Sequence, residues 1–485
     1  MQLISTRTDC AGISASAATL SGIAPDGGLY VPKMFPDLGA LDKIAEFSYS
    51  KLCAHVLGLF YDDISGLEKI TKEAYAGFGD VKTAPVVKTA PGEYMLELWH
   101  GPTLAFKDMA LSVLPRLMTA AKKDEGTILI LVATSGDTGK AALEGFRDVP
   151  GTRIAVFYPD GGVSYMQRLQ MVTQEGNNTH VMAVNGNFDD TQNTVKDIFT
   201  DKDFAALASA KGYSLSSANS INFGRLAPQI AYYAGAYAQL LSMKEITLGE
   251  KINFVVPTGN FGNILAAYYA KRMGLPIARL ICASNKNNIL TGFFNNGTYS
   301  LNRPFYKTMS PSMDILISSN LERLLFELTG RGFQAVGKMM KKLKDMGEYD
   351  IAPEAKKALK DDFFADWCGE DETAASIRKT FNEKNYLLDT HTAVAMGVYE
   401  KYKAGGDGTK TVIVSTASPY KFPRDVLASL GEDARGISDF DAARRLSGIT
   451  KTALPKQILE LEGKPVRHTG IYGKDELKQA VLSVL

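Results

Sequence analysis

Cysteine and histidine are scarce in this sequence of 485 residues, which holds four cysteines and five histidines. Cys10, Cys53, Cys282 and Cys368 are far apart, without a Cys-x-x-Cys pair, and the histidines are scattered. Structural zinc sites and disulfide frameworks depend on closely spaced or paired residues of these types. The sequence therefore argues against both, and it predicts a metal-free protein of a reducing, cytoplasmic compartment.

Long apolar runs and a charge imbalance are also missing. No run approaches the roughly 18 residues of a membrane span, and the first residues, MQLISTRTDC, lack the basic and apolar stretches of a secretory signal. With 54 basic and 53 acidic side chains, the formal net charge is +1. We therefore expect no nucleic-acid or membrane partner. The chain is too long for one ordinary core, so two or three domains are predicted.

Several catalytic signatures are absent as well. No strand leads into Gly-x-Gly-x-x-Gly, and neither the Gly-x-Ser-x-Gly elbow nor the zinc motif His-Glu-x-x-His occurs. The stretch TSGDTGK resembles a phosphate loop, but that motif requires Gly at Thr134 and Ser or Thr at Ala141. Dinucleotide enzymes, α/β-hydrolases and metalloenzymes are thus disfavoured.

What the sequence does contain is one repeated pattern: an apolar β-branched strand, a small polar loop, then a helix. Strands that alternate with helices predict an α/β fold, with mainly parallel sheets covered by helices on both faces. Ligands of such folds bind beyond the carboxyl ends of the strands, where these polar loops lie. The seven units begin near residues 94, 127, 153, 180, 252, 278 and 411.

Three segments depart from this pattern and suggest a division into domains. Residues 1–85, with the turn-rich GIAPDGGLYVP, predict an N-terminal subdomain, and residues 86–435 the α/β catalytic domains. Within them, about 333–385 is charged and predicts a helical insertion or lid, or equally a solvated helical face. Residues 436–485 form a polar C-terminal extension.

The loop PTGNFGN, residues 257–263, follows a strand and opens a helix. Gly259 and Gly262 allow successive N–H groups to point at one anion, and the helix N-terminus adds to the attraction. The loop therefore suits a phosphate group without a cationic side chain. Taken alone, it equally fits a plain glycine-rich turn.

A second loop, TSGDTG at 134–139, offers the hydroxyls of Ser135 and Thr138 at another helix N-terminus. A substrate carboxylate would suit it, although the same residue types are common helix caps. STASP at 415–419 presents hydroxyls at a further strand end. Each of these loops is a weak signal by itself.

Lys107 lies at or beside a helix start, where the dipole disfavours positive charge. Burial and the dipole together would lower its pKa and free the neutral amine to attack a carbonyl. An aldehyde cofactor with a phosphate explains both this lysine and the anion-binding loop, and pyridoxal 5'-phosphate (PLP) is that cofactor. A surface lysine in a first helical turn is the alternative.

These motifs also resemble a known family. GIAPDGGLYVP, LELWHGPTLAFKD, ATSGDTG, SANSINFGRL, PTGNFGN, DTHTAV and STASPYKF resemble, in order, the landmarks of threonine synthase over about residues 1–430. The length resembles the yeast-type branch. This resemblance implies the fold-type II architecture of PLP enzymes, similar to tryptophan synthase β: two parallel-sheet α/β domains plus a small N-terminal subdomain.

The resemblance assigns cofactor contacts. Lys107 would form the Schiff base with PLP, Thr416 would bond the pyridine nitrogen, and Asp137 would approach the cofactor hydroxyl, where many related enzymes have Asn. The cofactor phosphate would be held by the loop residues Gly259, Asn260, Phe261, Gly262 and Asn263.

It also assigns substrate contacts. Ser135 and Thr138 would receive the substrate carboxylate. The distal phosphate would meet Arg225, Asn219 and Ser220, with Lys421 as a further candidate. For His100 and His391, a structural role is at least as well supported as a catalytic one.

The implied enzyme is a carbon–oxygen lyase acting on phosphate, which converts O-phospho-L-homoserine and water into L-threonine and phosphate. The yeast-type branch favours a monomer over a dimer. The alternatives are a phospho-lyase that yields 2-oxobutyrate, another PLP lyase such as a serine/threonine dehydratase, and a non-catalytic small-molecule binding protein.

Overall fold

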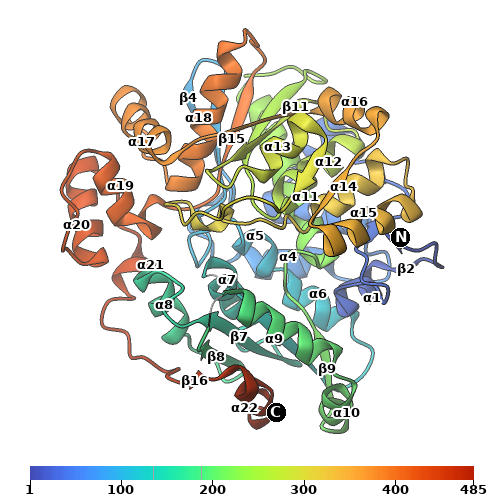
Figure 1. Ribbon diagram of the computed structural model, residues 1–485. Coiled ribbons are helices and arrows are strands. Elements are labelled where there is room, and N and C mark those ends of the chain that lie inside the picture. The colour runs from blue at the N-terminus through green and yellow to red at the C-terminus, as the bar shows by residue number, and fades with distance from the viewer. Residues whose placement is uncertain (135, 187) are drawn as a thin grey trace.

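Two mainly parallel sheets form the framework of the molecule (Figure 1). The computed structural model describes residues 1–134, 136–186 and 188–485. The larger sheet has the order β14-β11-β10-β15-β5-β4, and all its neighbours are parallel except β4 and β5. Its strands are β4 (Val86–Ala90), β5 (Glu93–Glu97), β10 (Ile252–Pro257), β11 (Ile277–Ser284), β14 (Phe363–Trp367) and β15 (Thr411–Ser415).

The second sheet is wholly parallel and has the order β16-β8-β7-β6-β9. Its strands are β6 (Thr127–Ala133), β7 (Thr152–Pro159), β8 (Thr179–Val184), β9 (Tyr213–Ser216) and β16 (Ile471–Tyr472). The seven predicted strands are present as β5, β6, β7, β8, β10, β11 and β15. Strands such as β6 and β10 are buried almost throughout, because helices cover both faces of a parallel sheet.

Helices connect and cover the sheets. Helix α11 (Phe223–Ser242) is buried along nearly its whole length, although it contains Pro228. It packs against α3 (Tyr49–Gly58), α5 (Asp108–Leu111) and α12 (Gly262–Arg272), which ties the N-terminal segment to the lobe of the larger sheet. Other helices around the sheets are α6 (Leu114–Ala121), α7 (Asp137–Phe146), α8 (Tyr165–Val172), α10 (Lys202–Ala210), α13 (Ile289–Asn296) and α18 (Thr390–Ala404).

The N-terminal segment has a small antiparallel sheet of its own. Strand β1 (Gln2–Ser5) pairs with β2 (Ile13–Ser14) and β3 (Tyr30–Pro32). Helices α1 (Ala15–Ser21), α2 (Leu41–Ile44), α3 and α4 (Leu67–Tyr75) follow. Leu3 and Val31 are fully buried and share one hydrophobic core with the larger sheet, so the segment packs on that lobe.

Residues 333–385 are not wholly helical, contrary to the prediction of a helical insertion. They contain α15 (Phe333–Met346), β13 (Glu348–Asp350), α16 (Pro353–Asp362), β14 and α17 (Glu370–Lys384). Because β14 pairs with β11 as an edge strand of the larger sheet, this segment completes the sheet. The charged, helix-rich composition around FFADW concealed the strand.

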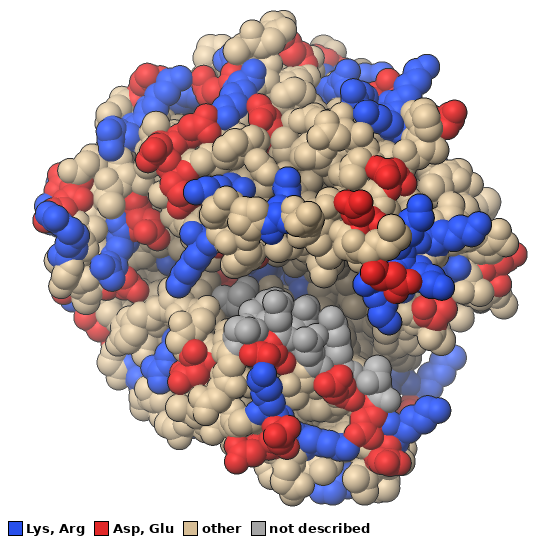
Figure 2. Space-filling view, viewed as in Figure 1, with Lys and Arg blue, Asp and Glu red and all other residues tan. Residues whose placement is uncertain are grey.

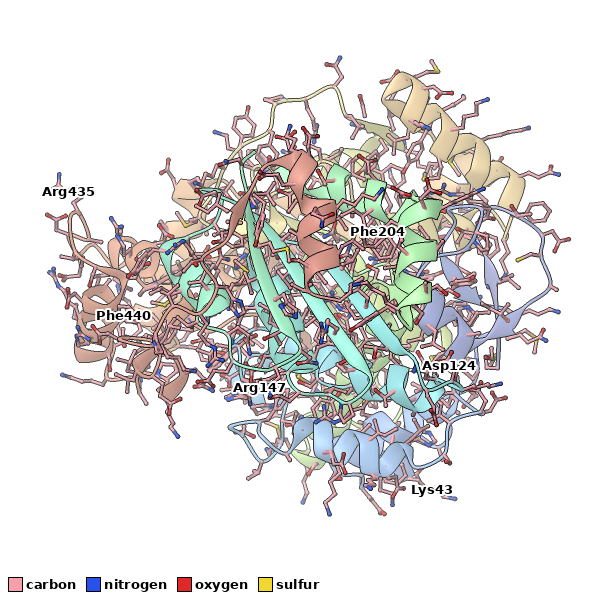
Figure 3. The ribbon with its side chains drawn as sticks, turned by 90° about the horizontal axis from the view of Figure 1, so that it is seen from below. Lys43, Asp124, Arg147, Phe204, Arg435 and Phe440 are labelled. Atoms are coloured by element: carbon pink, nitrogen blue, oxygen red, sulfur yellow. The ribbon has the colours of Figure 1, made fainter. Side chains whose placement is uncertain are left out.

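The C-terminal residues are likewise part of the framework. They form α19 (Pro423–Ser429), α20 (Asp439–Thr450), α21 (Lys456–Leu459), β16 and α22 (Leu477–Ser483), and β16 pairs with β8. Leu477 and Val481 are fully buried in the core of the smaller lobe. Figure 3 shows the α20 region, where Arg435 and Phe440 are labelled, at one side of the molecule. The boundaries at residues 85 and 435 stay predictions.

Charged side chains of both signs are interspersed over the face in Figure 2, which is hollowed between the lobes. This distribution accords with the formal net charge of +1. No helix among the described residues has the length and apolar character that a membrane crossing requires.

Candidate active site

A short backbone ladder brings Lys107 beside the end of β15. Phe106 donates its N–H to the Thr416 carbonyl at 2.8 Å, and Ser418 donates to the Leu104 carbonyl at 3.0 Å. These two bonds form an isolated antiparallel bridge between Ala105 and Ala417, just beyond the ends of the parallel strands β5 and β15. Lys107 and Thr416, which were predicted to share a site, lie on neighbouring loops at one edge of the sheet.

Protein groups surround the amino group of Lys107. Its Nζ lies 3.4 Å from Ser312 Oγ and 5.0 Å from the centroid of the Phe106 ring. Burial lowers the pKa of Lys107 to about 8, while the Asp137 carboxylate opposes this shift and the Arg225 cation adds to it. Helix α5 has only four residues, so burial, and not the helix dipole, is the main cause. The neutral amine, a nucleophile and a base, is thus accessible near pH 8.

Asp137, the first residue of α7, accepts hydrogen bonds on both oxygens. Oδ1 lies 3.1 Å from Lys421 Nζ and accepts from Gln167 Nε2 at 3.2 Å. Oδ2 accepts from Ser312 Oγ at 3.1 Å. Burial alone would raise the pKa of Asp137, but Lys421 and then Lys107 hold it well below its usual value. The carboxylate therefore stays ionised beside Lys107.

The PTGNFGN loop joins β10 to α12, and Phe261 caps the helix in the left-handed region, at φ 64°. Gly259 faces the backbone of residue 312, and a Cβ at Gly259 would lie 2.7 Å from the Ser312 carbonyl oxygen. Asn260 accepts through its carbonyl from both N and Nδ2 of Asn320, each at 3.1 Å. The absence of a side chain at Gly259 thus serves close packing as well as the predicted anion site.

Asn263 provides a buried donor in the first turn of α12. Its Oδ1 accepts hydrogen bonds from the hydroxyls of Tyr232 and Tyr233 on α11, the latter at 2.6 Å. Its Nδ2 is buried and has no hydrogen-bond partner among the residues that the structure describes. A buried donor without a partner is unfavourable unless a bound acceptor meets it. Asn263 is therefore suited to hold an anion at this loop.

The TSGDTG loop is only partly available for a ligand. Thr134 Oγ1 accepts from the N–H groups of Gly136 at 3.0 Å and Gly139 at 2.9 Å, so two of its donors are used within the loop. Thr138 is partly exposed, as a substrate contact requires. Ser135 lies outside the described residues, so its predicted contact has no structural description.

Of the residues predicted for the distal phosphate, Arg225 has the clearest setting. It is almost fully buried; Nη1 donates to the Ala218 carbonyl at 3.0 Å, and Nε has no partner among the described residues. Burial lowers the pKa of Arg225 to about 10, which leaves it cationic at neutral pH. Asn219 and Ser220 are partly exposed beside it. A buried cation with a free donor is an anion-binding group.

The two histidines have different surroundings. His100 bonds Glu97 through Nε2 at 2.7 Å and stacks on Trp99, with centroids 4.3 Å apart. His391 Nε2 instead accepts the backbone N–H of Ser312 at 3.1 Å. His100 thus has a local structural role, whereas His391 contacts the residue that bonds Lys107.

Sequence reasoning missed Ser312 and assigned Lys421 a different partner. Ser312 lies in a long irregular segment with no strand–loop–helix pattern, so no sequence signal pointed to it. Lys421 is 1% exposed and bonds Asp137, the Thr103 carbonyl at 2.9 Å and Gln170 at 3.4 Å. Its donors are engaged, so it is a poor candidate for the substrate phosphate.

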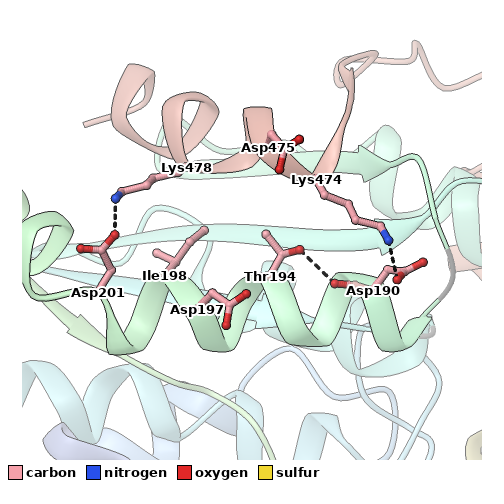
Figure 4. Close-up of a pocket in the computed structure, with 8 residues that line it drawn as sticks. All are labelled: Asp190, Thr194, Asp197, Ile198, Asp201, Lys474, Asp475 and Lys478. Atoms are coloured by element: carbon pink, nitrogen blue, oxygen red, sulfur yellow. Dashed lines mark hydrogen bonds and ion pairs between the residues drawn. The ribbon is translucent and has the colours of Figure 1, made fainter.

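A pocket of about 400 Å³ lies away from these residues, between α9 (Phe188–Thr200) and the C-terminal segment (Figure 4). Lys474 bonds Asp190 at 2.6 Å and Lys478 pairs with Asp201 across it. None of the predicted site residues lines this pocket.

A partly buried lysine of lowered pKa and a loop suited to an anion, both at the carboxyl ends of parallel strands, are typical of one class, the pyridoxal-phosphate dependent enzymes. Residues 90–339 match the family described as "Pyridoxal-phosphate dependent enzyme". Residues 2–75 match "Threonine synthase N terminus" and 392–481 match "Threonine synthase, C-terminal". The chain belongs to the threonine synthase family of these enzymes.

Similar proteins cover most of the chain. "Threonine synthase" of Pseudomonas aeruginosa is 38% identical over 436 residues, which are 88% of this chain and 90% of that protein. Human "Threonine synthase-like 1" is 40% identical over 434 residues, 86% of this chain. The match spans only 58% of that human protein.

Solved structures agree. A PLP-bound threonine synthase from Brucella melitensis superposes with a TM-score of 0.89 at 37% identity, over 100% of this chain and 99% of that one. The yeast threonine synthase gives 0.87 at 32% identity, over 100% and 98%. The predicted fold-type II architecture and the resemblance to threonine synthase are confirmed.

The residues present fit PLP, the predicted cofactor, which the family match confirms. Lys107 supplies an amine of lowered pKa for the aldehyde, and the unpartnered Nδ2 of Asn263 supplies a donor for the phosphate. Lys421, a second lysine in the site, uses its donors within the protein.

Proposed function

We propose that this chain is a threonine synthase, which converts O-phospho-L-homoserine and water into L-threonine and phosphate. The observation that carries this proposal is a second group suited to bind an anion: Arg225 is buried, has an unpartnered Nε among the described residues, and acts electrostatically on Lys107. An enzyme for an unphosphorylated amino acid would have no need of this cation.

The cofactor would be held by Lys107, by the N–H groups of the loop from Gly259 to Asn263, by the Asn263 amide and by the Thr416 hydroxyl. When bound, PLP stabilises negative charge at the Cα of an amino acid. Asp137, ionised and fixed by Lys421, would lie near the cofactor hydroxyl. A neutral Thr416 hydroxyl at the ring nitrogen does not enforce its protonation.

Lys107 would move the substrate protons. As a neutral amine it accepts the Cα proton at Nζ and later returns it. Arg225, with Asn219 and Ser220, would bind the substrate phosphate and retain it as the leaving group departs from Cγ. Thr138 and Ser135 would hold the substrate carboxylate. The segment that carries Ser312 packs on the PTGNFGN loop and would exclude bulk water from the reaction.

Incubation of the purified protein with O-phospho-L-homoserine tests this proposal. We expect equal amounts of threonine and phosphate, and no threonine from Lys107→Ala, which removes the base. 2-Oxobutyrate with phosphate would instead identify a phospho-lyase. Turnover retained in Lys107→Ala would refute the assignment of Lys107, and no consumption of substrate would favour a binding protein.

We also propose a cytoplasmic location, supported by four free cysteines, three of them buried. The proposed monomer rests on the resemblance to the yeast-type branch. Light scattering during gel filtration tests it, because a monomer has a mass of 52.6 kDa. The division at residues 85 and 435 is retained as our proposal for the domains.

A further inference from the structure

The segment from residue 301 to 320, here called the strap, joins β12 (Thr298–Ser300) to α14 (Leu321–Leu328) and carries Ser312 into the site. Asp314 fixes its middle, because Oδ1 accepts from Asn285 at 2.8 Å and from Thr308 at 2.7 Å. Ser318 fixes its end by donating to the Gly259 carbonyl at 2.7 Å. The strap is therefore held in one conformation on both sides of Ser312.

A histidine fixes the backbone of Ser312 itself. Ser312 donates its N–H to His391 Nε2 at 3.1 Å, and His391 Nδ1 lies 3.1 Å from Asp389 Oδ1. Since Nε2 accepts, the proton of the neutral ring is on Nδ1 and is donated to Asp389. His391 is 3% exposed and Asp389 is fully buried, so this tautomer is enforced by its surroundings.

The Ser312 hydroxyl then has one available orientation. It donates to Asp137 Oδ2 at 3.1 Å, because an ionised carboxylate only accepts. Its lone pairs therefore face Lys107 Nζ, which donates to it across 3.4 Å. A series of hydrogen bonds thus connects Asp389 to His391, His391 to the backbone of Ser312, and the Ser312 hydroxyl to Lys107.

We propose that Ser312 orients the amino group of Lys107 and that His391 is a positioning residue that acts through the Ser312 backbone. This role rests on the proposed function of Lys107 and deepens it. An amine that donates one N–H to a fixed acceptor has fewer orientations for its lone pair, which is the group that takes up the aldehyde and the substrate proton. Among the described residues, the charged groups that act most strongly on Lys107 are Asp137, Arg225, Lys421 and Asp108.

The pKa of Lys107 in the cofactor-free protein tests this role. Competitive acetylation across a pH series, read from the Lys107 peptide by mass spectrometry, gives that pKa directly. Ser312→Ala removes an acceptor from the ammonium form, so the pKa of Lys107 should fall by roughly 0.5 to 1 unit. His391→Leu should cause a fall in the same direction, and His391→Gln should restore the wild-type value, because its amide oxygen accepts the Ser312 N–H.

Ser310→Ala is the matched control, since Ser310 is on the same strap but its hydroxyl bonds Asn285 and Thr308. Its Lys107 pKa should equal that of the wild type. A Ser312→Ala value equal to the control value would overturn the proposal, whatever the folding of His391→Leu. A His391→Gln value that falls as far as that of Ser312→Ala would overturn the part played by His391.

The same proteins separate this inference from the proposed function. With PLP restored, Ser312→Ala should lower kcat with little change in KM, and Ser310→Ala should lower neither. If the pKa of Lys107 falls in Ser312→Ala but the wild type forms no threonine, the proposed function is refuted and the orienting role of Ser312 is retained. If the wild type forms threonine but the pKa of Lys107 is unchanged in Ser312→Ala, the orienting role of Ser312 is refuted and the proposed function is retained.

Discussion

The buried pair of Asp137 and Lys421 offers a sharp test of the site. Their side chains are 3% and 1% exposed, with Asp137 Oδ1 3.1 Å from Lys421 Nζ. Replacement of one partner leaves the other charge buried and uncompensated, which costs about 3–5 kcal/mol. We therefore expect Lys421→Met to reduce the free energy of unfolding by this amount. Asp137→Asn should reduce the free energy of unfolding to a similar degree, because it leaves the Lys421 ammonium buried without a counter-charge.

The double variant Asp137→Asn/Lys421→Met should recover most of this loss. Asn retains the shape of Asp: its amide oxygen accepts from Gln167 and its NH2 group donates to the Ser312 hydroxyl oxygen, while Met fills the space of the lysine. Urea unfolding of the four cofactor-free proteins at pH 7 measures the coupling, without a contribution from bound ligand. Losses under about 1 kcal/mol in the single variants, or losses that add in the double variant, would refute the reasoning.

The pH dependence of these proteins follows from the direction of the pKa shift. In the wild type the pKa of Asp137 is depressed, so its contribution to stability is present above the unfolded-state value of about 3.9 and is lost as pH falls through the folded value. In Lys421→Met burial should raise that pKa. The single variant should therefore regain stability as pH falls toward 5, a range in which the contribution of Asp137 to the stability of the wild type is constant.

Three further predictions concern other parts of the site. Gly259→Ala places a Cβ about 2.7 Å from the Ser312 carbonyl oxygen, so the strap must shift. Fluorescence titration should therefore show the affinity for PLP lowered at least ~10-fold. An unchanged affinity would contradict this packing. Arg225→Met should raise KM for the phosphorylated substrate about 10–100-fold, as expected for a lost charged hydrogen bond, while PLP affinity stays constant; equal losses of both would place Arg225 at the cofactor. The rate of covalent PLP uptake by the cofactor-free protein should rise through pH about 8 and then level off, because the neutral Lys107 amine reacts; a rate independent of pH would contradict the lowered pKa.

Much of the framework could be predicted from the sequence, because long buried strands read as apolar runs. Strand β6, with six consecutive buried residues, is such a case. Strand β14 was missed because it lies between charged helices, and β16 because it has only two residues. Their pairing partners, β11 and β8, are distant in the chain. Short edge strands are defined by that pairing and not by a local pattern.

The same distinction applies to the site. Lys107 and the PTGNFGN loop could be predicted, because each follows an apolar strand and carries a residue type with specific chemistry. Ser312 could not, since its bonds to Lys107 and His391 span 205 and 79 residues of the chain. The sequence pointed to Lys421 as a possible anion-binding cation, but only the folded structure shows that its ammonium forms an ion pair with Asp137.

The proposed reaction is a replacement in which the oxygen of water is added to the carbon skeleton and phosphate leaves it. Turnover of O-phospho-L-homoserine in ¹⁸O-labelled water, followed by mass spectrometry of the products, tests this most directly. The proposed function predicts threonine with the label in its hydroxyl group and phosphate without label, because the carbon–oxygen bond is broken. Labelled phosphate with homoserine, or 2-oxobutyrate in place of threonine, would contradict it.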